Sequence, residues 1–264
     1  MSSAPGQAYG ETMSRFYDLD WDAIGLTRAD ASFYARQAAL TQGSICEIGA
    51  GTGRVLFRVA QETRRSCVGV EPSEGMRQAF EQRRLEHGRP LCDLTRVVDG
   101  SFKRIPVPDG SQGFVYSAFR SFMHVLTEHD QILALREMTR ILAPGGLLAF
   151  DLFEPDYIHM VDAEPQEMYQ AETECGGTLS RLDSRHHMRA TQSIYVGMEW
   201  VMRDAKGAVT ATHEDGYTIR YTFRQELFSL LGVAGLEVVD VYGDFDQSPL
   251  DQSIRQLIIL ARPR

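Results

Sequence analysis

Short apolar runs alternate with longer amphipathic stretches along the chain from Ser44 onward. Apolar runs bounded by polar and glycine residues are typical of buried strands, and the stretches between them repeat their apolar positions with the period of a helix. Strands and helices in alternation indicate βαβ units that build a parallel sheet. The strands expected from this pattern span residues 44–49, 67–71, 95–99, 113–119 and 146–153.

The helix expected between the fourth and fifth strands has the clearest boundaries. Leu135 and Met138 lie on its apolar stripe. Thr127, followed three residues later by Asp130, resembles a capping box and predicts where the helix starts. Pro144 and the two glycines after it predict where the helix stops.

Beyond the fifth strand the pattern changes to a period of two. Residues 177–221 contain long polar and apolar alternations, which favour antiparallel strands inserted into the α/β body. A final helix is expected after Thr222, with Gln225 completing a second capping box. Two further strands, at 236–244 and 255–263, are expected to close the sheet with an antiparallel edge.

The predicted fold is therefore an α/β, doubly wound, seven-stranded and mostly parallel sheet. It carries an antiparallel β insertion after strand five. The expected segments are an N-terminal segment at 1–43, the core at 44–159, the insertion at 160–221 and the end of the core sheet at 222–264.

Composition limits the classes of partner. The chain has 264 residues, 43% hydrophobic and 24% charged, which suffices for one enzyme-sized domain. A formal net charge of −9 disfavours nucleic acids, whose binding needs clustered Lys and Arg. No apolar run is long enough to span a membrane, and the four cysteines show no metal-binding spacing. We expect a soluble, cytoplasmic monomer or homodimer that acts on a small molecule and binds neither nucleic acid, membrane nor metal.

Three glycines follow the first strand directly, in the sequence Glu-Ile-Gly-Ala-Gly-Thr-Gly. Gly49, Gly51 and Gly53 allow the main chain to approach a ligand next to the start of a helix, whose N–H groups are unsatisfied. The dinucleotide-binding motif G-x-G-x-x-G would need glycine at position 54, which is arginine. Glu71 ends the second strand, where a carboxylate can accept hydrogen bonds from both hydroxyls of a ribose.

Three motifs in register resemble the class I S-adenosylmethionine-dependent methyltransferases. They are Glu-Ile-Gly-Ala-Gly-Thr-Gly at 47–53, Val-Gly-Val-Glu-Pro-Ser at 68–73 and Leu-Ala-Pro-Gly-Gly-Leu-Leu-Ala-Phe-Asp at 142–151. The chain looks most similar to the bacterial small-molecule branch of that family. The resemblance implies a Rossmann-like fold and S-adenosylmethionine as the cofactor.

Roles for individual residues follow from this resemblance. The glycine loop is expected against the methionine part of the cofactor, Glu71 at the ribose and Glu47 at the methionyl amino end. The family commonly has an acid about five residues before a proline after strand three, and Ser101 occupies that place while Asp99 lies two residues earlier. Either residue remains a candidate for the adenine contact. The residues expected to contact the cofactor are Tyr17, Glu47, Gly49, Ala50, Gly51, Gly53, Glu71, Pro72, Met76, Ser101, Phe102 and Ala118.

The loop after the fourth strand, residues 118–124, lies where ligands bind in open α/β sheets. It lacks the Asn/Asp-Pro-Pro-Tyr/Phe sequence that is typical of amide-methylating members of the family. It also lacks an aspartate that could hold a divalent metal. His124 is the candidate general base, because histidine titrates near neutral pH. A purely structural role for His124, packed beside the loop, is the equal alternative.

Two further segments are expected around the acceptor. The insertion at 160–221 is expected to cover the acceptor pocket. In similar enzymes the N-terminal segment folds over the cofactor, so the resemblance implies that residues 1–43, with Tyr9, Phe16 and Tyr17, form an N-terminal helical lid. The expected function is methyl transfer from S-adenosylmethionine to an N or O atom of a small organic molecule. The alternative is an S-adenosylmethionine-binding protein of the same fold with other chemistry or no catalysis, since a fold alone does not define a function.

Overall fold

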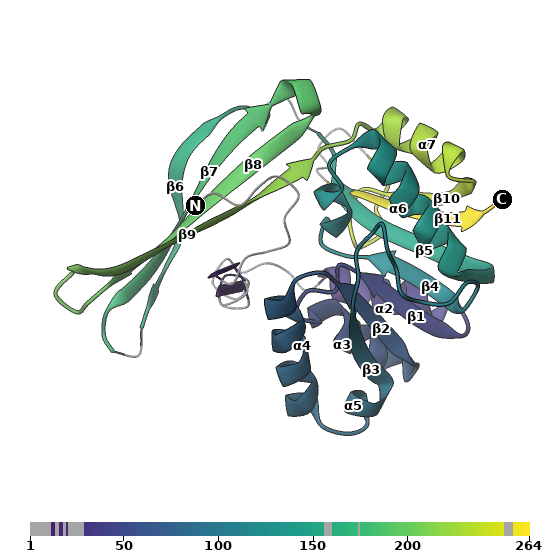
Figure 1. Cartoon of the computed structure of the whole chain (residues 1–264), viewed down its shortest axis with the longest axis horizontal. Coiled ribbons are helices and arrows are strands. Elements are labelled where there is room, and N and C mark those ends of the chain that lie inside the picture. The colour runs from purple at the N-terminus through teal and green to yellow at the C-terminus, as the bar shows by residue number, and fades with distance from the viewer. Residues whose placement is uncertain are drawn as a thin grey trace. The chain divides into compact units, whose positions relative to one another are not determined.

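The chain divides into two compact units, which are described separately. The computed structural model describes residues 12–13, 16–17, 20, 29–155, 160–173, 175–250 and 256–264. One unit contains the described residues of 28–156 and 220–264, and the other contains those of 1–27 and 157–219. Figure 1 shows a seven-stranded sheet flanked by helices in the first unit and a four-stranded sheet in the second.

The seven-stranded sheet confirms the predicted architecture. Its strand order is β10-β11-β5-β4-β1-β2-β3, so the chain winds outward from β1 in both directions. Its strands are β1 (Ser44–Ile48), β2 (Cys67–Glu71), β3 (Thr95–Asp99), β4 (Gln112–Ser117), β5 (Leu142–Phe153), β10 (Leu236–Tyr242) and β11 (Gln256–Pro263). Strand β11 pairs antiparallel with both β5 and β10, whereas β1 to β5 pair parallel. The carboxyl ends of β1, β2 and β4 therefore meet at one edge.

Helices cover both faces of this sheet. The helices of this unit are α2 (Ala29–Ala39), α3 (Arg54–Thr63), α4 (Glu74–His87), α5 (Leu91–Leu94), the 3-10 helix η1 (Ser121–His124), α6 (Glu128–Ile141) and α7 (Arg224–Val233). Phe33 of α2 and Leu56 of α3 share one buried cluster with Ile45 and Tyr116 of the sheet. Ala149 of β5 also belongs to this cluster. Because side chains alternate along a strand, the next residue, Phe150, points to the opposite face of the sheet. Its ring centroid lies 5.0 Å from that of Phe122 in η1.

The helix boundaries test the two predicted capping boxes. Thr127 caps α6, since its side chain accepts a hydrogen bond from the Asp130 N–H at 3.1 Å, as predicted. The prediction for α7 is wrong by one residue: the cap is Phe223, whose N–H donates to the Glu226 carboxylate at 3.4 Å. The predicted cap, Thr222, is fully buried, and its hydroxyl bonds to Arg220 and Gln131 instead.

The second unit is built on a four-stranded antiparallel sheet in the order β6-β7-β8-β9 (Figure 1). Its elements are β6 (Ala163–Glu172), β7 (Thr178–Met188), the 3-10 turn η2 (Arg189–Thr191), β8 (Ser193–Arg203) and β9 (Val209–Arg220). Strands β7 and β8 pair from Thr178 with Arg203 to Met188 with Ser193. The long alternations of the sequence therefore form the inserted antiparallel strands that were predicted.

The described N-terminal residues pack on this second sheet. Asp20 is buried and accepts hydrogen bonds from the Trp200 indole N–H at 2.9 Å and the Tyr169 hydroxyl at 2.6 Å. Arg181 adds an ion pair to Asp20 at 2.9 Å, and the Phe16 ring stacks on Trp200 at 5.1 Å. Helix α2, which lies within the segment 1–43, belongs to the seven-stranded unit, and its aromatic side chains are part of that core. Tyr9 lies outside the described residues, and the expected lid stays a prediction.

Candidate active site

The loop between β1 and α3 is shaped by its three glycines. Gly49, Gly51 and Gly53 all have left-handed backbone angles, with φ of 76°, 54° and 85°. A Cβ atom on Gly53 would lie 2.5 Å from the Phe57 ring and 2.6 Å from the Phe80 ring, so only glycine fits there. Among the described residues, none has an atom within 4 Å of a Cβ placed on Gly51. Within that part of the chain, the loop is tightly packed at Gly53 and uncovered at Gly51, where a ligand can approach its main chain.

Glu71, at the end of β2, is fixed by the backbone of two loops. One carboxylate oxygen accepts the Gly51 N–H at 2.9 Å and the other accepts the Ser73 N–H at 2.9 Å. Burial raises the pKa of Glu71, while these two N–H donors and the nearby Arg77 lower it. The carboxylate is therefore held beside the open part of the glycine loop and retains lone pairs for a ligand's hydroxyl groups.

Glu47 lies deeper than the glycine loop. Its side chain is 2% exposed and accepts a hydrogen bond from the Tyr116 hydroxyl at 3.0 Å. Burial raises the pKa of Glu47 well above its ordinary value, and the hydrogen bond from Tyr116 and the charge of Arg54 oppose that rise. Its expected contact with the amino end of the cofactor stays a prediction.

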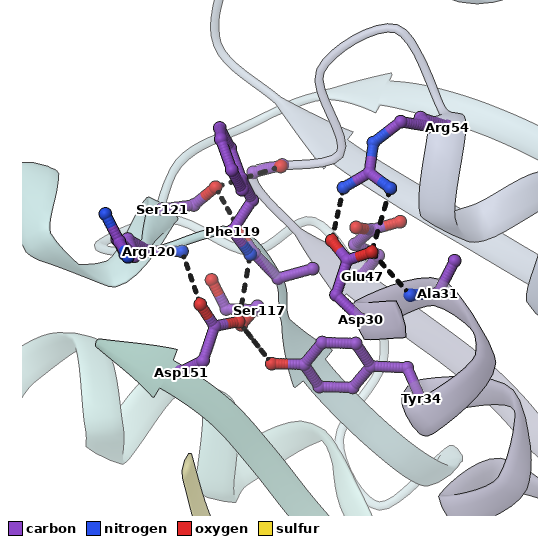
Figure 2. Close-up of polar contacts among 12 residues, drawn as sticks. Asp30, Ala31, Tyr34, Glu47, Arg54, Ser117, Phe119, Arg120, Ser121 and Asp151 are labelled. Carbon is purple, nitrogen blue, oxygen red and sulfur yellow. Dashed lines mark hydrogen bonds and ion pairs between the residues drawn. The ribbon is translucent and has the colours of Figure 1, made fainter. Parts of the chain in front are cut away.

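An ion pair joins the first residue of α3 to the first turn of α2. Arg54 contacts both carboxylate oxygens of Asp30, and its Nη1 lies 2.9 Å from Oδ1 (Figure 2). Asp30 is buried, and the Arg54 guanidinium lies 5.8 Å from the centroid of the Phe119 ring. No sequence pattern predicts this pair, because a single acid some distance before the glycine loop is not distinctive.

The remaining predicted cofactor contacts differ in exposure. Ala50, Met76 and Ala118 are buried, whereas Pro72 is exposed and Tyr17 is half-buried. These positions are compatible with roles at the carboxyl edge for the residues of the seven-stranded unit. Their contacts with a cofactor stay predictions.

The two candidates for the adenine contact lie in different surroundings. Asp99 is 59% exposed at its side chain and forms ion pairs with Arg77 at 3.3 Å and Arg104 at 3.2 Å. Ser101 is half-buried, and its backbone N–H and carbonyl both pair with Arg104 at 3.0 Å. Phe102 lies next to Ser101, with a ring atom 3.8 Å from the Cβ position of Gly49. Phe102 thus lies next to the glycine loop, and Asp99 forms ion pairs with two arginines.

The loop after β4 also meets the glycine loop. The Ser121 hydroxyl donates to the Ala118 carbonyl at 2.8 Å and reaches the Gly49 carbonyl at 3.4 Å. A Cβ on Gly49 would lie 2.7 Å from the Ser121 Cβ, so the two loops are in close contact. His124 ends the same short helix, η1, and is half-buried.

A buried carboxylate of β5 supports the loop from below (Figure 2). Asp151 accepts hydrogen bonds from the Phe119 and Arg120 N–H groups, both at 2.9 Å, and from the Tyr34 hydroxyl at 2.6 Å. Burial raises the pKa of Asp151 to about 6, although Tyr34 and Arg120 oppose that rise. Sequence analysis missed this group, since Asp151 was noted only as the end of a motif.

Two negative findings apply to the described residues only. Among them, no cluster of three or more His, Cys, Asp or Glu side chains is arranged to hold a metal ion. Their helices also include none that is long and apolar enough to cross a membrane.

Comparisons with known proteins agree with this geometry. Residues 45–146 match a family described as a methyltransferase domain. The chain is 22% identical to the cypemycin N-terminal methyltransferase of a Streptomyces species over 96% of each protein. It is 25% identical to the CcbJ methyltransferase of Streptomyces caelestis, with a TM-score of 0.82 over 98% of this chain and 99% of that one. The sugar N-methyltransferase KedS8 of Streptoalloteichus shares the fold, with 20% identity and a TM-score of 0.74 over 100% of this chain and 98% of that one.

The seven-stranded sheet, the glycine loop and these similarities define a class of enzyme. The match of residues 45–146 to the methyltransferase-domain family and the similarity to methyltransferases along the chain indicate an S-adenosylmethionine-dependent methyltransferase with a Rossmann-like fold. The residues present fit that cofactor, because the open space at Gly51 and the fixed carboxylate of Glu71 lie at the same edge of the sheet. When bound, S-adenosylmethionine supplies an electrophilic methyl group, and the protein's main contribution is to align an acceptor with it.

Proposed function

We propose that this enzyme transfers the methyl group to an N or O atom of a small organic molecule. The observation that carries the proposal is the contact of Ser121 with Gly49, because it brings the helix that ends in His124 against the cofactor loop. An imidazole near that edge can remove the proton that an attacking amine or hydroxyl loses. A relative that matches 96% of this chain is named as an N-terminal methyltransferase, so amines are the first acceptors to test.

A labelled-methyl transfer assay tests this proposal. The enzyme is incubated with methyl-labelled S-adenosylmethionine and panels of amines, amino sugars, phenols and carboxylates, and products are identified by mass spectrometry. Label appearing in an amine or hydroxyl product supports the proposal. Label appearing only on carbon, or only on a nucleic acid offered in parallel, contradicts it.

The role of His124 is tested with the acceptor so found. His124→Asn should lower turnover by about 10² to 10⁴ if the imidazole acts as general base, with affinity for S-adenosylmethionine unchanged. His129→Asn is the matched control, because His129 is an exposed residue of the neighbouring helix α6. If His124→Asn keeps more than about a third of wild-type turnover, alignment alone carries the reaction and His124 has a structural role.

We also propose that Glu71 binds the ribose hydroxyls of the cofactor. Glu71→Ala should weaken binding of S-adenosylhomocysteine by about 1.5 to 3 kcal/mol, because charge-assisted hydrogen bonds are lost. Since Glu71 also accepts the Gly51 N–H, part of that loss comes from the loop. Glu71→Gln keeps the shape and removes the charge, but its single acceptor oxygen leaves one of the two backbone N–H groups without a partner, so it reports the combined loss without a change of size. Calorimetry that finds unchanged affinity in both variants would overturn the assignment.

A further inference from the structure

The turn that follows β4 has an unusual backbone for its residues. Phe119 and Arg120 are consecutive non-glycine residues with left-handed angles, with φ of 53° and 61°. A side chain disfavours this region, because Cβ approaches the following carbonyl oxygen, so the conformation persists only where its surroundings enforce it. Such strain concentrates at functional sites, and here it lies in the loop that touches the glycine loop.

Asp151 holds Phe119 and Arg120 in this left-handed conformation. Its two carboxylate oxygens accept separate hydrogen bonds, Oδ1 from the Phe119 N–H and Oδ2 from the Arg120 N–H, each at 2.9 Å. The turn points the two neighbouring N–H groups toward one place, and a carboxylate complements that pair. Figure 2 shows Asp151 below the turn, with both dashed lines converging on it.

Tyr34 fixes the carboxylate in turn. Its hydroxyl donates to Asp151 Oδ1 at 2.6 Å and lies 3.1 Å from the Ser117 carbonyl, the last residue of β4. Both the Tyr34 and Asp151 side chains are buried, and the Tyr34 ring stacks on Tyr116 at 4.8 Å. Helix α2 therefore controls the orientation of Asp151 and the end of β4 together.

The turn positions Ser121, which packs against the glycine loop. Ser121 follows directly after it and begins η1, with its N–H bonded to the Ala118 carbonyl at 3.2 Å. Its Cβ occupies the position 2.7 Å from where a Cβ of Gly49 would lie. A shift of the turn would displace Ser121 and remove one wall of the glycine loop.

We propose that Asp151 is a positioning residue for the cofactor site: its buried carboxylate, oriented by Tyr34, holds the left-handed Phe119–Arg120 turn so that Ser121 packs against Gly49. Neither Asp151 nor Tyr34 is assigned a contact with S-adenosylmethionine. Their effect on its binding passes through the backbone of the turn.

A rescue experiment distinguishes this role from a merely structural one. Asp151→Asn offers one acceptor oxygen in place of two, so one N–H of the turn loses its partner. Calorimetry with S-adenosylhomocysteine should then show affinity weakened about tenfold, the scale of leaving a buried donor unpaired. Glycine adopts the left-handed conformation without strain, so adding Arg120→Gly should raise the affinity of the Asp151→Asn variant by at least about threefold.

The matched control is Arg64→Gly in the same Asp151→Asn background. Arg64 is exposed and also left-handed, with φ of 56°, but it caps the far end of α3. It relieves a comparable strain without touching the turn, so it should leave the weakened affinity unchanged. Equal rescue by Arg64→Gly would show that general stability is responsible and would overturn the proposal.

Two other results would also overturn it: an affinity of Asp151→Asn within about twofold of wild type, or no rescue by Arg120→Gly. If Asp151→Asn does not fold, as judged by circular dichroism, the same comparison is made on Tyr34→Phe. That variant removes only the hydroxyl that orients Asp151, and it should weaken affinity about threefold and respond to Arg120→Gly in the same way.

Discussion

Two buried acids of the seven-stranded unit differ from one buried acid of the four-stranded unit in the backbone groups that they hold. In the seven-stranded unit, Glu71 and Asp151 accept hydrogen bonds from backbone N–H groups of the loops that follow the strands. In the four-stranded unit, Asp20 accepts from the side chains of Tyr169, Arg181 and Trp200, which lie 149 to 180 residues away in the sequence. The first arrangement shapes a main chain for a ligand, and the second ties a distant segment to a sheet.

This difference separates binding from stability. A carboxylate that holds a loop should affect ligand affinity when it is removed, because the loop is the binding surface. A carboxylate that joins side chains should affect the stability of its own unit and leave the cofactor edge alone. The variants below test that division, beginning with the largest expected effect.

Two glycines of the same loop should respond differently to alanine. Gly53→Ala should lower the free energy of unfolding by about 3 to 5 kcal/mol, since it combines left-handed strain with overpacking against Phe57 and Phe80. Gly51→Ala should cost only about 1 to 2 kcal/mol of stability, because its Cβ meets open space. It should nevertheless weaken S-adenosylhomocysteine binding, since that open space is proposed to face the ligand.

Denaturant unfolding and calorimetry on both variants measure the two effects. The ranking of stability loss should be Gly53→Ala over Gly51→Ala. A Gly51→Ala variant that binds with wild-type affinity would show that the ligand does not approach the loop at Gly51.

Removal of Asp20 tests the four-stranded unit. Asp20→Ala leaves the buried Arg181 with one acid, Asp183, in place of two, and should destabilise this unit by about 3 kcal/mol. Amide hydrogen exchange should rise in β7 and β8 and stay unchanged in β1 and β4. Asp183→Ala is the control, and because Asp183 is less buried its effect should be smaller. Equal acceleration in β1 would show that the two units unfold together.

Asp151 should leave a signature in the pH dependence of stability. Burial raises its pKa from its ordinary 3.8 to about 6, so between about pH 4 and 6 the native state binds more protons than the unfolded state. Its contribution to stability is therefore lost as pH rises through that window, by about 3 kcal/mol at 1.36 kcal/mol per pKa unit. The charged and titratable groups around it are Tyr34, Arg120 and Asp30.

Asp151→Asn removes this titration while Glu47 and Glu71, whose pKa values are also raised, still titrate. Unfolding free energies measured from pH 4 to pH 7 should thus fall less steeply in the variant than in the wild type. Parallel curves would mean that Asp151 does not change its protonation in that range.

Features with a local sequence pattern could be predicted, whereas contacts between distant residues could not. Alternating apolar runs and closely spaced glycines are local signals, and they predicted the seven-stranded sheet, the inserted antiparallel strands and the start of α6 at Thr127. The cap of α7 was misplaced because Thr222 with Gln225 has the residue types of a capping box. Thr222 is instead buried against Arg220, and the cap is Phe223 with Glu226.

The support of the β4 loop had no comparable signal. Phe119 and Arg120 are left-handed without being glycine, so their residue types do not predict the turn. Tyr34 and Asp151 lie 117 residues apart, and only the packing of α2 against the sheet brings them together. Contacts fixed by tertiary packing are the part of this site that the sequence leaves undetermined.

The smallest expected effect concerns the adenine contact. The Asp99 carboxylate is exposed between Arg77 and Arg104, so Asp99→Asn removes only surface ion pairs and should leave S-adenosylhomocysteine affinity nearly intact. The backbone N–H and carbonyl of Ser101 are hydrogen-bonded to the backbone of Arg104, so its hydroxyl is the group that can bind a ligand. Ser101→Ala should therefore cost under about 1.5 kcal/mol of binding, the scale of one neutral hydrogen bond. Calorimetry on the two variants gives the ranking directly, and a larger loss in Asp99→Asn would assign the adenine contact to Asp99 and require the arginines to release it.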